Sequence, residues 1–313
     1  MHIEKRRVGE RTKYYLAHSF RKGKKVKKIR IYLGADLSEE KLALRKKEAG
    51  KKIKQRITAA ERITDPYMAA ISLSEIKELQ TLEAHGRIRV FHLSELDWQK
   101  FTEAFTYDTN AIEGSSIKAR EVKEILEKEE WPEERTKEEL AEVYGVVEAV
   151  AHIRKIKEHL SLSLIKKLHA IVFKNSKAFA GRFRDRGVEV VIADASGNTV
   201  HRGAPSEEVP TLLKKLIGWY AKNKNKYTPL VLAAVVHNQF ENIHPFRDGN
   251  GRVGRLLLNN ILLKHNLPPL NIELRNRPEY YKALQEYEKS HNIRPMIILM
   301  LKEYRTLRRM LRR

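Results

Sequence analysis

The chain contains no cysteine among its 313 residues. Disulfides, thiolate metal sites and cysteine nucleophiles are therefore excluded. It also lacks any apolar run approaching the ~18 residues that a membrane-spanning helix requires. Its first residues hold no apolar segment of the kind that marks a secretory signal. We therefore expect a cytoplasmic protein that does not enter a membrane.

Acidic residues are scarce near the start of the chain. Residues 1–60 hold 20 Lys and Arg against 6 Asp and Glu, whereas the rest of the chain holds 42 against 34. A strongly basic segment beside a nearly balanced body indicates an anionic partner, with nucleic acid as the first candidate. The alternative is a solvated, charge-rich surface, and composition does not separate the two.

These first 60 residues predict a small basic unit that contains a β-hairpin and a helix. Residues 1–35 predict β structure. Within them, apolar and aromatic runs at residues 14–17 and 29–33 flank a polar, glycine-containing connection, which is typical of a β-hairpin. Asp36 or Ser38 can cap a helix that runs to about residue 56. Residues 64–66 (Thr-Asp-Pro) then interrupt the chain, because the residue before proline disfavours helix. We place a domain boundary near residue 60.

Residues 61–313 predict a mainly α-helical domain. Apolar residues recur there at three-to-four spacing behind polar caps. A β-hairpin at residues 188–201 breaks this pattern, and it either covers a site or offers an edge to a partner strand. The predicted helices span residues 74–85, 94–109, 119–130, 136–159, 163–174, 206–222, 229–243, 252–265, 278–290 and 295–311.

A polar loop at residues 244–255, with the sequence HPFRDGNGRVGR, joins two of these helices. Both helices are apolar over most of their surface, so they should be buried. A loop held between two buried helices is rigid, and such positions commonly carry function. We therefore take this loop as the candidate active site.

The residue types in the loop suit a phosphorylated ligand. Gly249 and Gly251 flank Asn250, so the backbone there can take positive φ and direct N–H groups into one concavity. The helix that follows adds the positive end of its dipole, which favours an anion. Arg252 and Arg255 are three residues apart and can each make forked contacts with phosphate oxygens.

Two further residues of the loop suggest an enzyme. Asp248 offers a hard oxygen ligand suited to a Mg²⁺ ion that bridges phosphates. His244 can lose its proton near neutral pH, as a general base that activates a hydroxyl must. Each feature alone has a plain structural explanation as a turn, a core histidine or a surface charge. Their combination in this order predicts an enzyme that binds a magnesium nucleotide.

The loop resembles the signature of the Fic family of nucleotidyltransferases, H-x-F-x-[DE]-G-N-G-R-x-x-R. The likeness extends over about residues 95–305, including the run Gly181-Arg182-Phe183-Arg184 before the hairpin. It implies a Fic-type helical bundle core in which the hairpin is a flap over the site. All fixed positions of the signature are met, by His244, Phe246, Asp248, Gly249, Asn250, Gly251, Arg252 and Arg255.

The resemblance implies transfer of AMP from ATP, with Mg²⁺, to a Ser, Thr or Tyr hydroxyl of a protein, its own chain included. His244 would take the hydroxyl proton, Asp248 would hold the metal, and the flap would align the target by strand addition. Tyr280 and Tyr281 would lie near the adenine, although a plain core role for one of them stays open. Whether the protein forms a homodimer is also open. The implied nucleotide-binding residues are Asp248, Gly249, Asn250, Gly251, Arg252, Gly254, Arg255, Val191, Ile192, Tyr280 and Tyr281.

A second motif fits the same family. The run from Thr109 to Gly114 resembles the inhibitory motif [ST]-x-x-x-E-[GN], here on a helix of about residues 94–114. Glu113 would pair with Arg255 and occupy the cation meant for the γ-phosphate. The alternative for the same residues is a simple helix C-terminus at Gly114.

Two positions depart from the family's usual pattern. Gly203-Ala204-Pro205 stands where many relatives have two prolines after the flap, and Glu288 stands where a neutral polar residue is common. The exit of the flap and the base preference are therefore open. Three functions remain: an adenylyltransferase restrained by Glu113, the same site removing AMP from a protein, and a nucleic-acid-binding regulator acting through residues 1–60.

Overall fold

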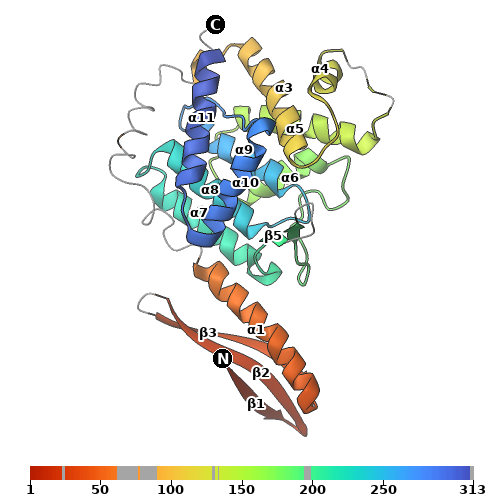
Figure 1. Ribbon diagram of the computed structural model, residues 1–313, viewed down its shortest axis with the longest axis vertical. Coiled ribbons are helices and arrows are strands. Elements are labelled where there is room, and N and C mark those ends of the chain that lie inside the picture. Colours follow the sequence, from red (N-terminus) through yellow and green to blue (C-terminus); the bar gives the residue numbers. More distant parts are fainter. Residues whose placement is uncertain are drawn as a thin grey trace.

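Figure 1 shows the computed structural model of the protein, which describes residues 1–22, 25–61, 77, 90–128, 131–132, 134–193 and 199–310. The chain is mainly helical, as the sequence predicts, with a small sheet at its N-terminus. Among the described residues, no helix combines the length and apolarity needed to cross a membrane. The interruption predicted at residues 64–66, and the helix predicted at 74–85 apart from residue 77, lie outside the described ranges.

The N-terminal unit is a three-stranded antiparallel sheet covered on one face by a helix (Figure 1). Its elements are β1 (His2–Val8), β2 (Arg11–Lys22), β3 (Lys25–Ala35) and α1 (Glu39–Glu61). Leu16 and Leu33 of the sheet pack against Ala49 and Ile53 of α1 in a separate small core. The sequence predicted β structure over residues 1–35 and the two runs of the β2–β3 hairpin, but no separate run for β1, which carries mainly charged side chains. Helix α1 also continues beyond its predicted end near residue 56.

Most helices of the body share one hydrophobic core, while α4 packs in a smaller cluster with α5. The helix predicted over residues 136–159 ends at Lys155, because Ile156 takes an extended conformation with ψ 157°. The helices are α3 (Glu95–Ile112), α4 (Ala119–Lys128), α5 (Lys137–Lys155), α6 (Leu162–Phe173), α7 (Val209–Asn223), α8 (Pro229–Ile243), α9 (Asn250–Lys264), α10 (Arg277–Ser290) and α11 (Arg294–Met310). Short 3-10 turns lie at Val90–His92, Ser206–Glu208 and Leu274–Asn276.

Polar caps fix the starts of α3 and α5. Ser94 and Thr136 each accept a hydrogen bond from the backbone N–H three residues later, and the side chains of Asp97 and Glu139 accept one from the cap backbone in return. Such capping boxes satisfy two otherwise unpaired N–H groups, and a cap of this kind contributes about 1 kcal/mol. The cap at Ser94 therefore stabilises the helix that carries Glu113 just beyond its other end.

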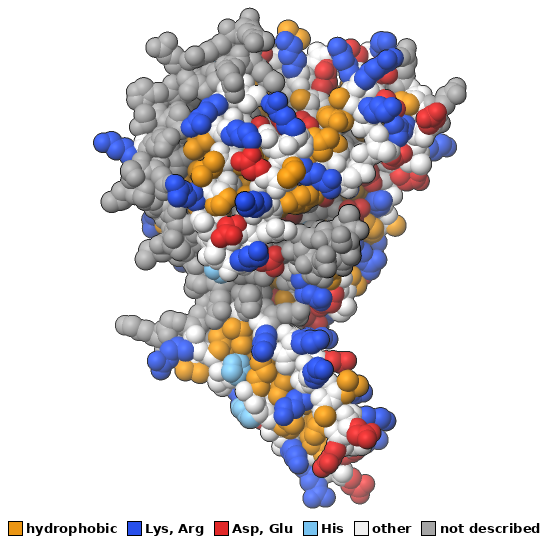
Figure 2. All heavy atoms as spheres, viewed as in Figure 1, with side chains coloured by type: hydrophobic (Ala, Val, Ile, Leu, Met, Phe, Trp, Pro, Cys, Tyr) orange, Lys and Arg blue, Asp and Glu red, His pale blue; other side chains and the backbone are white. Residues whose placement is uncertain are grey.

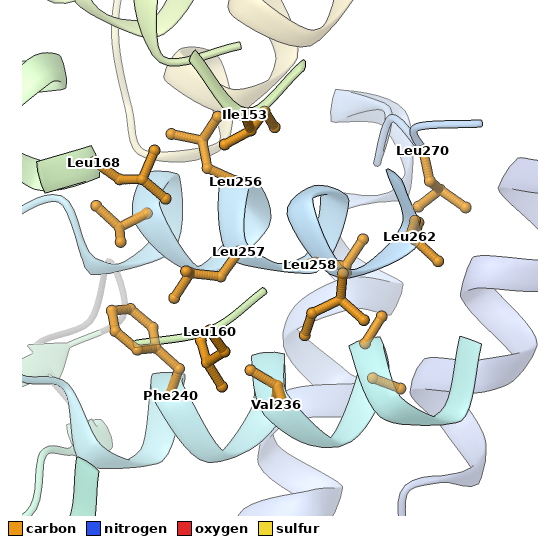
Figure 3. Packing of buried hydrophobic residues seen from close by; sticks show 14 of the residues in the cluster. Ile153, Leu160, Leu168, Val236, Phe240, Leu256, Leu257, Leu258, Leu262 and Leu270 are labelled. Atoms are coloured by element: carbon orange, nitrogen blue, oxygen red, sulfur yellow. The ribbon is translucent and has the colours of Figure 1, made fainter. Parts of the chain in front are cut away.

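Helices α8 and α9 lie at the centre of the body, and each is buried along almost its whole length. In Figure 3, Leu258 of α9 faces Val236 of α8, whereas Leu256 points the other way toward Ile153 and Leu168. Burying one such side chain stabilises the fold by about 1.5–3 kcal/mol. The helix ends that flank residues 244–249 are therefore held firmly by packing on both sides.

The hairpin predicted at residues 188–201, which we call the flap, is present as two antiparallel strands, β4 (Val191–Ala193) and β5 (Thr199–Arg202). Val191 lies opposite Arg202, and Ile192 lies opposite His201. The backbone N–H of Gly203 continues the pairing by donating to the carbonyl of Val190 at 3.1 Å. The connecting residues 194–198 lie outside the described ranges.

Candidate active site

The loop between α8 and α9 turns through two left-handed residues. His244, which ends α8, has φ 51°, and Gly249, which precedes α9, has φ 76°. The expected positive φ is wrong for Gly251, which lies in the first turn of α9. Glycine is required at this position for a steric reason, because a Cβ there would lie 2.0 Å from Oε1 of Glu113. Gly251 therefore makes room for a carboxylate at the N-terminus of α9.

Asn250 and Phe246 close the loop from inside. The backbone N–H of Phe246 donates to Oδ1 of Asn250 at 2.9 Å, and Nδ2 of Asn250 donates to the carbonyl of Phe246 at 3.0 Å. The Phe246 ring is fully buried and stacks on His169, with 3.8 Å between ring centroids. The side chain of Asn250 is therefore engaged in shaping the loop.

His169 of α6 supports the same loop through its backbone. The N–H of Gly181 donates to Nδ1 of His169 at 2.8 Å, so the ring hydrogen lies on Nε2. That Nε2 donates to the carbonyl of Asp248 at 3.2 Å. Burial lowers the pKa of His169 to about 4, so the ring is neutral at pH 7. The sequence indicated no role for His169, which is 79 residues from its partner.

Arg184 ties the start of the loop to the base of the flap. Its Nε donates to the carbonyl of His244 at 2.8 Å, and its Nη1 donates to the carbonyl of Val188 at 2.5 Å. Its Nη2 donates to the carbonyl of Ala204. Carbonyls from three chain segments thus converge on one buried guanidinium, which fixes His244 relative to both ends of the flap.

Replacing Gly249 with alanine is expected to destabilise the fold by about 3 kcal/mol or more. A Cβ would lie 2.1 Å from the Phe173 ring, and the positive φ adds strain. Gly114→Ala is the matched control: Gly114 has φ 95°, but its Cβ would meet no atom within 4 Å. Only the backbone strain of about 1–2 kcal/mol is expected there. Urea denaturation measures both free energies of unfolding, and equal losses would contradict a cost from the Phe173 contact.

The imidazole of His244 is oriented by the last turn of α8. Its Nδ1 lies 3.2 Å from the carbonyl oxygen of Glu241, and because a carbonyl only accepts, Nδ1 carries the hydrogen. Nε2 then holds the lone pair that a general base requires. His244 is 6% exposed and lines the pocket described below.

Glu241 is a buried acid beside this histidine. Its Oε2 lies 3.9 Å from Nδ1 of His244. A Cβ at Gly254 would fall 2.2 Å from its Oε1, so Gly254 lies where α9 passes the carboxyl group of Glu241. Burial, reinforced by the negative charge of Glu113, raises the pKa of Glu241 to about 8. The carboxyl group is therefore protonated at pH 7.

This raised pKa predicts a pH-dependent stability. Its folded value of about 8 lies above the unfolded value of 4.5, so the folded chain holds an extra proton between these pH values. The associated stabilisation is complete below pH 4.5 and is lost as the pH rises through 8. Glu241→Gln keeps a neutral side chain at every pH, so we expect its free energy of unfolding to fall less between the two limits than that of the native chain. Glu134→Gln, at an exposed position, is the control, and a native-like pH profile of Glu241→Gln would refute the assignment.

Arg255 is buried and bound by groups from two other helices. Its Nε donates to Oγ1 of Thr109 at 2.8 Å, and its Nη2 donates to the Thr109 carbonyl at 2.9 Å. The same Nη2 lies 2.8 Å from Oε1 of Glu113 in an ion pair. Its Nη1 donates to the phenol oxygen of Tyr280 at 3.3 Å. The pairing of Glu113 with Arg255 that the resemblance implied is therefore present in the structure.

The end of α3 brings Glu113 to this arginine. The helix stops at Ile112, Glu113 is its C-cap, and Gly114 follows in the left-handed conformation. The N–H of Gly114 donates to the carbonyl of Ala111 at 3.0 Å. The two interpretations of this motif, a helix C-terminus and a carboxylate that reaches Arg255, are thus compatible.

Arg252 is directed toward α5. It is 5% exposed, its Nη1 donates to the carboxylate of Glu142, and its Nη2 lies 3.6 Å from Oδ1 of Asp248. Its guanidinium lies over the Phe173 ring, 4.5 Å from the centroid. Nothing in the sequence indicated Glu142, which is 110 residues from Arg252. In this structure Arg252 links the start of α9 to α5.

A pocket with a volume of about 340 Å³ lies at the loop. This size is within the range of small-molecule sites. The predicted site residues that line it are His244, Asp248, Gly249, Asn250, Gly251, Glu113, Val191, Tyr280 and Tyr281. The other lining residues are Val190, Glu241, Asn242, Arg247, Arg277, Leu284, Gln285 and Glu288.

The two tyrosines differ in their surroundings. Tyr280 is 1% exposed, and its hydroxyl lies 2.9 Å from Nε2 of His237. Tyr281 is half-buried, and its hydroxyl donates to the carbonyl of Ile112 at 3.1 Å. The predicted site residues that do not line the pocket are Arg252, Gly254, Arg255, Thr109 and Gly114. The side chain of Ile192 is not among those that the structure describes.

Comparison with known proteins agrees with this geometry. Residues 159–262, which include the whole loop, match the model of the Fic/DOC family. The Protein adenylyltransferase Fic of Nematostella vectensis is 29% identical over 197 residues, covering 61% of this chain and 44% of that protein. The Protein adenylyltransferase fic-1 of Caenorhabditis elegans is 32% identical over 189 residues, covering 58% of this chain and 35% of that protein. The chain therefore spans less than half the length of these curated relatives.

Solved structures share the fold. A Fic domain containing signaling protein from Bacteroides thetaiotaomicron matches with a TM-score of 0.61 at 24% identity, covering 74% of this chain and 90% of that one. A segment of Fic-1 from C. elegans matches with a TM-score of 0.58 at 22% identity, covering 88% of this chain and 77% of that one. The helical fold and the loop together define a Fic domain. Residues 159–262 thus form a domain of the Fic/DOC family.

Proposed function

We propose that the protein is an adenylyltransferase that moves AMP from magnesium-bound ATP to a Ser, Thr or Tyr hydroxyl of a protein, its own chain included. The observation that carries the proposal is one pocket in which the N-terminus of α9 and the lone-pair nitrogen of His244 meet. A helix N-terminus favours phosphate, and a positioned imidazole suits removal of a hydroxyl proton. Relatives named protein adenylyltransferase, which match over about 60% of the chain, support the same reaction.

In the proposed reaction, the hydroxyl oxygen of the target attacks the α-phosphorus of ATP. A new oxygen–phosphorus bond forms, the bond from the α-phosphorus to the oxygen that bridges to the β-phosphorus breaks, and pyrophosphate leaves. The hydroxyl proton passes to Nε2 of His244, while Nδ1 keeps its own hydrogen and continues to donate it to the carbonyl of Glu241. That carbonyl therefore holds the ring in place before and after proton transfer.

The residues at the loop fit a magnesium ion. Asp248 lines the pocket with a side chain that is 47% exposed, and it supplies one hard oxygen ligand. Mg²⁺ is commonly held by one or two carboxylates together with substrate phosphates and water. Bound there, the ion would neutralise charge on the phosphates and on the departing pyrophosphate. Glu241, which is neutral at pH 7, would not compete for it.

We also infer that Glu113 restrains the enzyme. Its carboxylate occupies Arg255 and the space in front of Gly251, at the helix terminus where phosphates would bind. A γ-phosphate would compete with Glu113 for the same guanidinium, because both are anions that accept forked hydrogen bonds. ATP held without that contact would present its α-phosphorus in a non-productive position.

The flap and the two tyrosines bound the pocket on its remaining sides. Val191 at the start of β4 lines the pocket and is 42% exposed. We propose that the target segment adds as a strand beside the flap and thereby brings its hydroxyl to His244. The nucleoside would lie against Tyr281 and Glu288, both of which line the pocket.

One observation favours a second candidate, removal of AMP from a modified protein. The side chain of Glu113 is 27% exposed and lines the same pocket, where a carboxylate can orient water toward a phosphorus atom. The two candidates differ in the effect of Glu113→Gly. The variant gains AMP transfer in the first, whereas it loses AMP release in the second.

The deciding experiment uses the Glu113→Gly chain with Mg²⁺ and ATP labelled at either the α- or the γ-phosphate. Adenylyl transfer predicts that protein retains the α-label and not the γ-label, with a mass gain matching AMP. Retention of the γ-label would indicate phosphoryl transfer instead. Absence of both labels from the chain and from added protein would reject the proposal.

A further inference from the structure

The N-terminal sheet ends in a ribbon of two strands. Strand β1 pairs with β2 only from Val8 opposite Arg11 to His2 opposite Ala17. Strands β2 and β3 continue together beyond that point, as far as Lys22 opposite Lys25. At about 3.3 Å per residue, this continuation is roughly 15 Å long. The sheet thus presents a projecting two-stranded end.

The segment that forms β2 and β3 carries only positively charged side chains among its ionised Lys, Arg, Asp and Glu residues. Residues 11–35, which form β2, β3 and their connection, contain 9 Lys and Arg and no Asp or Glu. Figure 2 shows Lys and Arg side chains spread over the N-terminal unit, with hydrophobic side chains between them. An uninterrupted positive ribbon is complementary to a polyanion and is costly to place beside another cationic surface.

The sheet face opposite α1 is built from tyrosines and cations. Leu16 and Leu33 face α1, so their neighbours Tyr15 and Tyr32 lie on the other face. These rings are paired across the strands, with centroids 5.2 Å apart, and Tyr32 is 52% exposed. The guanidinium of Arg6 lies over Tyr15, 5.6 Å from its centroid. The exposed face is therefore an ordered surface rather than a set of independent side chains.

Glu4 orients two more cations on this face. It lies opposite Tyr15 in the register, it pairs with Lys28, and Nε of Arg30 donates to its Oε2 at 2.7 Å. Hydrogen bonds from Lys28 and then Arg30 lower the pKa of Glu4 to about 2, so its charge persists across the physiological range. Its carboxylate holds both side chains along the same face, where Arg21 follows at the projecting end.

We propose that this face, with the two-stranded end of β2 and β3, binds double-stranded DNA in its major groove. The B-form groove is about 12 Å wide and admits a two-stranded ribbon, whose strands are about 4.8 Å apart. The A-form groove of RNA is too deep and narrow for side chains to read. The lysines and arginines would contact phosphates at the groove edges. This inference is independent of the proposed transferase reaction, because it uses none of the residues at the α9 loop.

The native full chain tests the proposal by fluorescence anisotropy with a mixed-sequence DNA duplex of about 20 base pairs. Four contacts, from Arg6, Arg21, Lys28 and Arg30, predict that log K falls with log salt with a slope of about −4. Duplex RNA and single-stranded DNA of the same sequence are expected to bind at least about 10-fold more weakly. Equal affinity for all three, no binding at low salt, or capture by anionic vesicles in place of DNA would overturn the proposal.

Paired variants separate this face from general positive charge. Arg21→Gln with Lys28→Gln is expected to weaken binding about 10-fold and to reduce the salt slope by about 2. Lys214→Gln with Lys289→Gln removes the same charge from exposed positions of α7 and α10, and we expect less than about a 2-fold change. Equal losses in the two pairs would overturn the proposal. Circular dichroism checks that the Arg21→Gln, Lys28→Gln variant is folded. If it is unfolded, the native chain's relative affinities for duplex DNA, duplex RNA and single-stranded DNA decide whether the proposal holds.

Discussion

Replacing Glu113 with glycine is expected to raise the rate of AMP transfer to protein by about 10- to 100-fold, the usual range of coupling between two sites. The native side chain holds Nη2 of Arg255 at 2.8 Å and fills the space beside Gly251. Glycine removes both the competing charge and the bulk. Glu113 is also the C-cap of α3, where glycine is well tolerated, so the change leaves the helix end intact. Label transferred from α-labelled ATP, followed over time, measures the gain.

Glu113→Gln distinguishes the two causes of restraint. Glutamine keeps the shape of the side chain against Gly251 but loses the charge that pairs with Arg255. If competition for the guanidinium dominates, the glutamine variant should approach the rate of the glycine variant. If the filled space dominates, glutamine should stay near the native rate. ATP affinity, measured by calorimetry, should rise with the rate in either case.

A matched control lies ten residues earlier, within α3. Glu103→Gln removes an acid from α3 that contacts Gln99 at the surface and not the pocket. Its rate should equal that of the native chain. If Glu113→Gly left the rate unchanged while ATP still bound, the restraint would have to be abandoned. If it instead abolished AMP release from a modified protein, the second candidate function would stand.

The loop at residues 244–255 was predictable because the residues that define it are adjacent in the sequence. Two apolar segments and the polar residues between them were enough to identify the loop, and Gly249 takes the left-handed conformation that the pattern requires. The starts of α3 and α5 followed from their polar caps, Ser94 and Thr136. Periodicity and capping depend on neighbours within one or two turns, so they are visible in the sequence alone.

The supports of the loop were not predictable, because they come from distant parts of the chain. Arg184 reaches the carbonyl of a residue 60 positions later, and Glu142 reaches Arg252 across 110 positions. Neither contact has a sequence pattern, since each depends on how whole helices pack. Strand β1 was not distinguished as a separate run within residues 1–35 for a related reason: its partner on β2 determines it, and its own side chains are mostly charged.

Gly251 and Gly254 have a structural role that the sequence did not indicate. Both were predicted from their place in the loop signature as contacts of the nucleotide. In the structure a Cβ at Gly251 would meet Glu113, and one at Gly254 would meet Glu241. Each glycine therefore admits a carboxyl group close to the backbone of α9. The binding of nucleotide by these two positions remains a prediction.

Exchanging His244 in the Glu113→Gly background is expected to lower the rate of AMP transfer by about 100- to 10,000-fold, the usual contribution of a general base. The target hydroxyl then loses the imidazole as its proton acceptor, and the neighbouring Glu241 is a poor substitute because burial raises its pKa. ATP affinity should be almost unchanged, because His244 contributes a base rather than a contact to phosphate. Rate and affinity therefore separate a chemical role from a structural one.

The choice of substitution matters because His244 has φ 51°. Alanine disfavours this left-handed conformation, whereas asparagine adopts it readily and cannot act as a base near neutral pH. We therefore expect His244→Asn to retain the native unfolding temperature and ATP affinity and still to lose the activity that His244→Ala loses. His92→Ala, at an exposed position, should keep full activity. If His244→Asn transferred AMP at the rate of its parent, proton removal by the imidazole could not be part of the mechanism, and the bound hydroxyl would have to lose its proton to another group.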